Sequence, residues 1–233
     1  MLETQSFIYK QMVINNLNKI NINGFICDPL LIKEKDDRFC QAIFSIISNN
    51  KHITNNFNNL CDLLLNEDCG ILYKINNKNY KSFGSLHFTF MQQISFNDFN
   101  NNKLSSEELG LHYNILKDII ILPFNIHYKK LICTQTSLAL CGYPDIDINS
   151  LRDKYRDRCK FYNLKLKEPY YNDIIHSTLF RFTNKTDHEI FIKKYEYYLN
   201  NDIDYGYVTI DHFDIGNGTW KLNPNEIIIN HTI

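Results

Sequence analysis

The sequence predicts an α+β fold in which two similar halves follow a mainly helical N-terminal segment. Three observations support this class. Strand patterns alternate with capped helix patterns after Gly70, the same order of elements occurs twice, and the composition is that of a globular protein, with 44% hydrophobic and 22% charged residues. The 233 residues are enough to bury a core, either as one large domain or as two small lobes.

The first 66 residues are expected to be mainly helical. Apolar residues recur with helical spacing in three segments of this region, which are Glu3–Leu17, Arg38–Ile47 and Ile53–Leu65. Cys69 and Gly70 mark the end of the region. The predicted organisation is therefore a helical extension over residues 1–66, packed on a core domain over residues 67–233.

Two halves with the same order of elements follow. Each has an apolar strand that carries a histidine, then a polar loop, a capping box, a helix and further strands. The two predicted capping boxes are Ser105-x-x-Glu108 and Thr186-x-x-Glu189. In the first half we expect these elements at Ile71–Ile75, Ser85–Phe90, Leu109–Ile120, Asn125–Cys133 and Thr136–Cys141. In the second half we expect them at Asp173–Phe182, Ile190–Leu199, Tyr205–Ile215, Thr219–Leu222 and Glu226–His231, after a helix over Ser150–Tyr162. The repeated order of elements is what an old duplication of an α+β lobe would leave.

The charge balance limits the kind of partner. The chain has 25 Lys and Arg against 26 Asp and Glu, so its formal net charge is -1. This value excludes a protein that coats nucleic acid by bulk electrostatics. A nucleic-acid partner would need a local basic patch or a small binding site, so we expect no binding to long duplexes.

The cysteines and the apolar runs indicate the compartment. The sequence has seven cysteines and no Cys-x-x-Cys, which is typical of reduced, mostly buried thiols inside a cell. The N-terminus lacks the pattern of a signal peptide, and the densest apolar run, Ile115–Phe124, is interrupted by Lys117 and Asp118. We expect a cytoplasmic monomer with no membrane partner, in the host cytoplasm if the source is a virus.

Two His-x-Thr triplets carry the functional signal. They are His87-Phe88-Thr89 and His176-Ser177-Thr178, one in each half. Residues two apart on a strand point to the same face, so each triplet presents an imidazole and a hydroxyl side by side. The alternative is that both histidines are satisfied core residues of a structural protein, since buried polar groups always need partners.

With this pair the sequence resembles the 2H phosphoesterase superfamily, which has the LigT-like fold. His176-Ser177-Thr178-Leu179-Phe180-Arg181 is similar to that family's His-x-Thr-Leu-x-Arg, whereas the first triplet is followed by Phe90 in place of the common Leu. The resemblance covers residues from about Gly70 to Ile233. It implies a bilobal fold, with two pseudo-symmetric antiparallel-sheet lobes around a central cleft that both motifs face.

The resemblance implies a phosphodiesterase with His87 and His176 as the catalytic pair and Thr89 and Thr178 as phosphate ligands. In-line hydrolysis needs a base on the nucleophile and an acid on the leaving oxygen, and two imidazoles supply both because they titrate near neutrality. Threonine hydroxyls can donate to the non-bridging oxygens. No metal or other cofactor is expected, and the pH–rate profile should be bell-shaped in EDTA.

Five further side chains are candidates for substrate binding. Arg181 lies three residues beyond Thr178, on the opposite face by strict alternation, so a salt bridge at the lobe edge is as consistent with the sequence as a phosphate contact. The others are aromatic and could stack on a nucleobase or belong to the core: Tyr143, Tyr170, Tyr171 and Trp220.

The segment Leu151–Glu168 has the one local excess of basic residues. It predicts either a solvated helix with i,i+4 ion pairs or a wall that attracts an anionic nucleotide. Other catalytic classes lack their patterns: there is no His-Glu-x-x-His, no paired Cys spacing, no Gly-x-Ser-x-Gly and no P-loop.

Taken together, the sequence predicts hydrolysis of a nucleotide phosphodiester. Three substrates are open: a 2′,3′-cyclic phosphate at an RNA end, a 2′–5′ oligoadenylate or a cyclic dinucleotide. The three substrates share the chemistry at phosphorus and differ only in the pocket walls that they need. The alternative is a non-catalytic module that binds RNA or a nucleotide in the same cleft.

Overall fold

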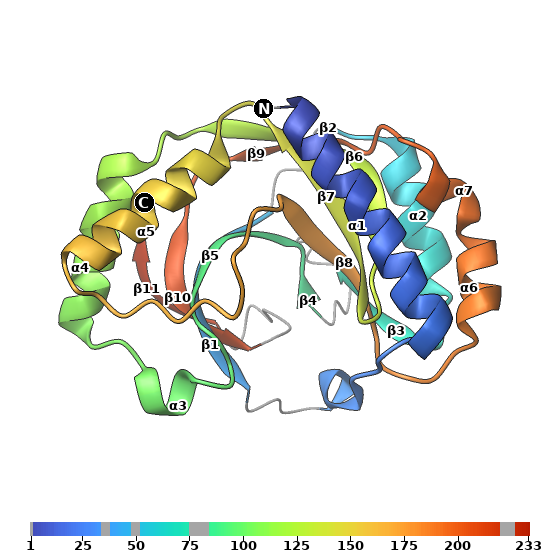
Figure 1. Ribbon diagram of the computed structural model, residues 1–233, viewed down its shortest axis with the longest axis horizontal. Helices are drawn as coiled ribbons and strands as arrows, with labels where there is room; N and C mark the ends of the chain where they lie inside the picture. Colours follow the sequence, from blue (N-terminus) through green and yellow to red (C-terminus); the bar gives the residue numbers. More distant parts are fainter. Residues whose placement is uncertain (1, 34–37, 48–51, 75–83, 220–226) are drawn as a thin grey trace.

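Two sheets meet at the centre of the molecule, where strand β5 (His87–Ile94) of one lies against β8 (His176–Phe182) of the other (Figure 1). The computed structural model describes residues 2–33, 38–47, 52–74, 84–219 and 227–233. The bilobal α+β architecture with an N-terminal helix is confirmed. Trp220 and most of the strand expected at Thr219–Leu222 lie outside the described residues.

The smaller sheet has four strands in the order β11-β10-β1-β5, all antiparallel. Its other members are β1 (Phe39–Ile46), β10 (Asp214–Thr219) and β11 (Ile228–Thr232). Strand β5, with the first His-x-Thr triplet, therefore lies at the edge of this sheet that faces the other lobe.

The larger sheet has seven strands in the order β2-β9-β6-β7-β8-β3-β4, and only β3 and β4 run parallel. Besides β8 it contains β2 (His52–Ile53), β3 (Gly70–Lys74), β4 (Gly84–Ser85), β6 (Phe124–Cys133), β7 (Ser137–Pro144) and β9 (Gly206–Ile210). The second triplet thus stands inside this sheet, between β7 and β3.

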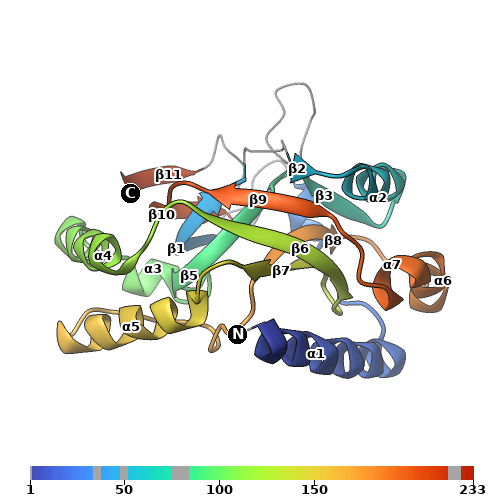
Figure 2. The same cartoon turned by 90° about the horizontal axis from the view of Figure 1, so that it is seen from above.

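Helices cover the sheets in two groups (Figure 2). Beside the smaller sheet lie α3 (Phe99–Asn102), α4 (Ser106–Ile119) and α5 (Ile148–Phe161). Beside the larger sheet lie α1 (Leu2–Asn23), α2 (Asn55–Leu65), α6 (His188–Lys194) and α7 (Glu196–Asn200), with a short 3₁₀ turn at Pro29–Ile32 after α1. No helix in the described part of the chain has the length and apolar character of a membrane span.

Local capping signals set where two of these helices begin. The capping box predicted for α4 is present: Ser105 Oγ accepts from the Glu108 N–H at 3.2 Å, and the Glu108 carboxylate accepts from the Ser105 N–H at 2.8 Å. In α6 the predicted box at Thr186 is replaced by Asp187, whose carboxylate accepts from the N–H groups of Glu189 and Ile190.

The helix predicted over Arg38–Ile47 is wrong, because Phe39–Ile46 form strand β1. This strand pairs with both β5 and β10, and five consecutive residues of it are buried. In a strand that is buried on both faces, apolar and polar residues do not alternate. The spacing of its apolar residues therefore does not distinguish it from a buried helix. Residues 1–66 are therefore not a purely helical extension, since they supply an inner strand of the smaller sheet.

Both motif strands contain a one-residue bulge directly after the threonine. In β5, Thr89 lies opposite Phe44 and Met91 opposite Ile43, which leaves Phe90 as the extra residue. In β8, Thr178 lies opposite Ala139 and Phe180 opposite Leu138, which leaves Leu179 as the extra residue. Such a bulge shifts the alternation of the side chains that follow it by one position.

Candidate active site

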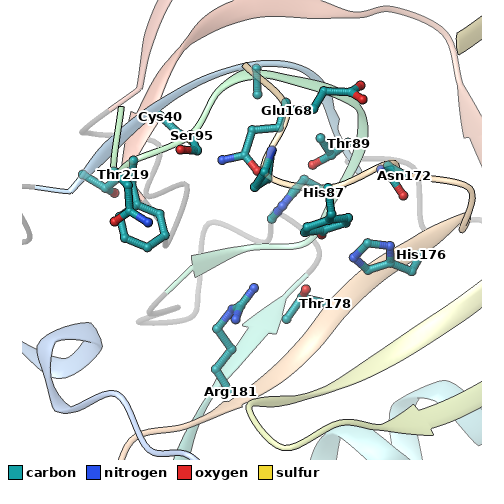
Figure 3. Close-up of a pocket in the computed structure, with 16 residues that line it drawn as sticks. Cys40, His87, Thr89, Ser95, Glu168, Asn172, His176, Thr178, Arg181 and Thr219 are labelled. Carbon is teal, nitrogen blue, oxygen red and sulfur yellow. The ribbon is translucent and has the colours of Figure 1, made fainter. Parts of the chain in front are cut away.

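A single pocket between the two sheets is lined by both His-x-Thr triplets (Figure 3). His87 and Thr89 line it from β5, and His176 and Thr178 line it from β8. On each strand the histidine and the threonine are two residues apart, so they share the face toward the pocket. The structure therefore brings together all four side chains that the sequence singled out.

Arg181 also lines this pocket, and its predicted position on the opposite face is wrong. The bulge at Leu179 is the reason. It adds one residue to β8 and returns Arg181 to the face that carries His176 and Thr178. A guanidinium beside two hydroxyls is a typical anion-binding group.

Gln92 is the counterpart of Arg181 in the first lobe, and it is a site residue that sequence reasoning missed. It lies three residues after Thr89, as Arg181 lies three residues after Thr178, and the bulge at Phe90 brings it to the pocket face. The only signal in the sequence was that each polar residue lies three positions after its motif threonine. This spacing indicates a shared face only once both bulges are known.

The His87 ring is held by a backbone carbonyl. Its Nδ1 lies 2.8 Å from the Ser85 carbonyl oxygen. Because a carbonyl only accepts, Nδ1 carries the proton, and Nε2 of the neutral ring has the lone pair. The same contact stabilises the ring when it gains a second proton. In the part of the chain that the structure describes, the His176 ring has no such hydrogen bond.

Burial and positive neighbours lower the pKa of both imidazoles. The pKa of His87 falls to about 4, mainly through burial and further through Arg181, although the Ser85 carbonyl opposes the shift. The pKa of His176 falls to about 3, through burial first and then through the charges of Arg152, His87 and Arg181. Both rings are therefore neutral at pH 7 unless an anion joins them.

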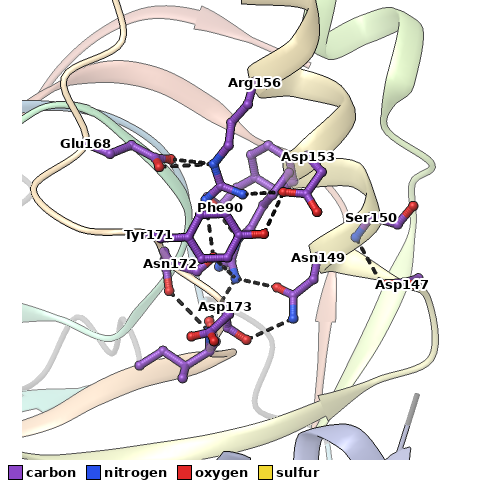
Figure 4. A network of polar contacts seen from close by, with 12 residues as sticks. Phe90, Asp147, Asn149, Ser150, Asp153, Arg156, Glu168, Tyr171, Asn172 and Asp173 are labelled. Carbon is purple, nitrogen blue, oxygen red and sulfur yellow. Dashed lines mark hydrogen bonds and ion pairs between the residues drawn. The ribbon is translucent and has the colours of Figure 1, made fainter.

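The segment that joins α5 to β8, residues 162–175, forms one wall of the pocket and is called the strap below. Its lining residues are Glu168, Pro169, Tyr170 and Asn172, and Tyr170 is 60% exposed at the rim. Arg156 of α5 holds the strap through the Glu168 carboxylate, at 3.0 Å from Nε (Figure 4). Further lining residues come from β1, from β10 and from the end of β5 and the residues after it: Cys40, Ala42, Ser95, Phe96, Asn97 and Thr219.

Two of the predicted aromatic contacts are not in the pocket. The Tyr143 ring packs edge-on against Tyr9, with ring centroids 5.5 Å apart, on the outer side of the larger sheet. The Tyr171 hydroxyl donates to Asp153 at 2.8 Å, and its ring stacks on Arg156 (Figure 4). Among the described tyrosine candidates only Tyr170 lines the site, since Tyr143 packs against α1 and Tyr171 turns toward α5.

The basic segment Leu151–Glu168 matches neither of its two readings as a whole. Lys154, Arg158 and Lys160 are exposed, as a solvated helix would have them. Arg152, however, is completely buried beneath the pocket. Among the described residues, no group of three or more His, Cys, Asp or Glu side chains is placed to hold a metal ion.

No protein-family model and no curated protein matches the sequence. The chain is similar in structure to Escherichia coli LigT. The LigT structure complexed with ATP is 12% identical with a TM-score of 0.49, and the match covers 83% of this chain and 96% of that one. Usb1 of Kluyveromyces marxianus is 8% identical with a TM-score of 0.42, covering 82% and 97%. At these values the likeness concerns the fold, and the activity proposed below is argued from the pocket.

Proposed function

We propose that this chain is a metal-independent phosphodiesterase that hydrolyses a nucleotide phosphodiester with His87 and His176 as its acid–base pair. One observation carries the proposal: two imidazoles from different sheets line one pocket, each with a threonine hydroxyl beside it. In-line displacement needs an acid and a base on opposite sides of phosphorus, and two facing strands supply groups on opposite sides.

The surroundings of the two rings support His87 as the acid and His176 as the base. The Ser85 carbonyl stabilises a protonated His87, whereas Arg152 disfavours a protonated His176, and Arg181 disfavours protonation of both rings. A proton brought in with the anionic substrate therefore rests on His87. His176 removes a proton from water, the water oxygen bonds to phosphorus as the ester P–O bond breaks, and His87 gives its proton to the leaving oxygen.

Four further side chains would stabilise the charge on the non-bridging oxygens. Thr89 and Thr178 offer hydroxyl donors, Arg181 offers a guanidinium and Gln92 offers an amide, two groups from each strand. Donors held in place by strands need no reorganisation when charge develops on phosphorus. Tyr170 at the rim is placed to stack on a base, and the partly polar walls fit a nucleoside.

A substrate panel in excess EDTA tests the proposal. The panel contains 2′,3′-cyclic nucleotides, 2′–5′ oligoadenylate and cyclic dinucleotides. We expect turnover of at least one class and no response to the chelator. Tight binding of a panel member without turnover would favour the non-catalytic nucleotide-binding module instead, and neither binding nor turnover would reject both.

Anion binding is expected to take up a proton. Inorganic sulfate stays a dianion over the working pH range, so any pH dependence of its binding comes from the titration of groups in the protein. Because the free His87 titrates at about pH 4 and a bound dianion raises its pKa, the dissociation constant for sulfate should increase with pH, by up to about tenfold per unit. Calorimetry between pH 5 and 8, in two buffers with different ionisation enthalpies, measures the uptake. A dissociation constant that is flat over this range, or a dependence that survives in His87→Gln, would contradict the prediction.

A further inference from the structure

Arg152 is a completely buried cation without a carboxylate in its hydrogen-bonding shell. It lies on α5, below the pocket, and has 0% exposure. Its guanidinium donates to the Phe90 carbonyl at 2.7 Å, the Thr89 carbonyl at 3.0 Å and Asn149 Oδ1 at 3.0 Å. Burying an unpaired charge is costly, so an arginine in such a place needs a reason beyond packing.

The remaining acceptors come from the other lobe. Nη1 of Arg152 donates to the Ile174 carbonyl at 2.9 Å and to the Asn172 carbonyl at 3.4 Å. Asn172 and Ile174 belong to the strap that leads directly into His176. One side chain therefore contacts the backbone of β5 at the threonine and the bulge, and the backbone of the segment that ends two residues before the histidine of β8.

We propose that Arg152 is a positioning residue that ties the two motif strands together through their backbone carbonyls and so sets the separation of His87 and His176. This inference rests on the proposed function of the pocket. The planar fork of a guanidinium suits the task, because its donors have fixed directions and all three of its nitrogens donate here to neutral oxygens.

The charge of Arg152 gives the proposal a second readout. The titratable and charged groups that act on His176 are Arg152 from α5, His87 from β5 and Arg181 from β8 itself, and all three lower its pKa. Burial also lowers the pKa of Arg152, to about 10, so it stays charged at pH 7. Removing this cation should therefore raise the pKa of His176, whatever the reaction is.

Two substitutions separate geometry from charge. Arg152→Lys keeps the cation but loses the fork, whereas Arg152→Met loses both. Arg158→Met is the matched control, since Arg158 lies on the exposed face of the same helix. We expect Arg152→Lys to lower kcat about 10- to 100-fold with KM within about threefold, because a displacement of about 1 Å at the reacting groups has an effect of that size. The control should stay within about twofold of the wild type.

Histidine NMR titrations make the outcome independent of turnover. The pKa of His176 should rise in Arg152→Met and stay near the wild-type value in Arg152→Lys and Arg158→Met. If the wild type hydrolyses nothing, the proposed function fails, while this pattern of pKa values still supports the role of Arg152. Full kcat in both Arg152 variants with an unchanged His176 pKa would overturn the inference. Loss of folding in both variants would also overturn it, by assigning Arg152 to the core alone.

Discussion

Replacement of His87 or His176 with alanine is expected to lower kcat about 10²- to 10⁴-fold, the range for loss of a general acid or base. Both rings line the pocket, so the variants should fold as the wild type does. His52→Ala is the matched control, since His52 is exposed and lies outside the pocket. The measurement is kcat on the best substrate of the panel, with circular dichroism to verify folding.

The nature of the leaving group separates the two roles. A nucleoside p-nitrophenyl phosphate loses a phenolate that needs little help from an acid. On this substrate His87→Ala should recover most of the lost rate, whereas His176→Ala should not, because the attacking water still needs a base. Recovery in His176→Ala alone would reverse the assignment, and recovery in neither would remove the acid–base division altogether.

Replacement of either motif threonine with valine is expected to lower kcat about 10²-fold, the lower part of the range for one lost oxyanion donor. Thr178 is only 5% exposed and Thr89 is half-buried, and valine keeps the shape of both without the hydroxyl. The serine variants keep the hydroxyl and should stay within about fivefold of the wild type. If valine and serine behave alike at both positions, the hydroxyls do not bind the phosphate.

The strand motifs were predictable because the rule that reveals them is local. Residues two apart on any strand share a face, so His87 with Thr89 and His176 with Thr178 could be paired without knowing the fold. The capping box at Ser105 is equally local, since its two hydrogen bonds join residues three apart. Both triplets and the box at Ser105 are present in the structure, whereas the box predicted at Thr186 is replaced by a cap at Asp187.

What the sequence did not predict depends on contacts between distant segments. The bulges that bring Arg181 and Gln92 to the pocket arise from pairing with β7 and β1, and strict alternation places both residues on the wrong face. Strand β1 is covered on both faces by the fold itself, which erased its alternation. Arg152 looked like one of several solvated basic residues, because its five acceptors come from segments up to 63 residues away.

The double variant His87→Ala/His176→Ala, measured beside both single variants and the wild type in excess EDTA, tests the central claim most directly. Two groups that act as a unit on one phosphate lose their effect together, so the double variant should be no slower than the slower single variant by more than about threefold. The wild type should keep its full rate in the chelator. Losses that multiply in the double variant, or a wild-type rate abolished by EDTA, would contradict the account.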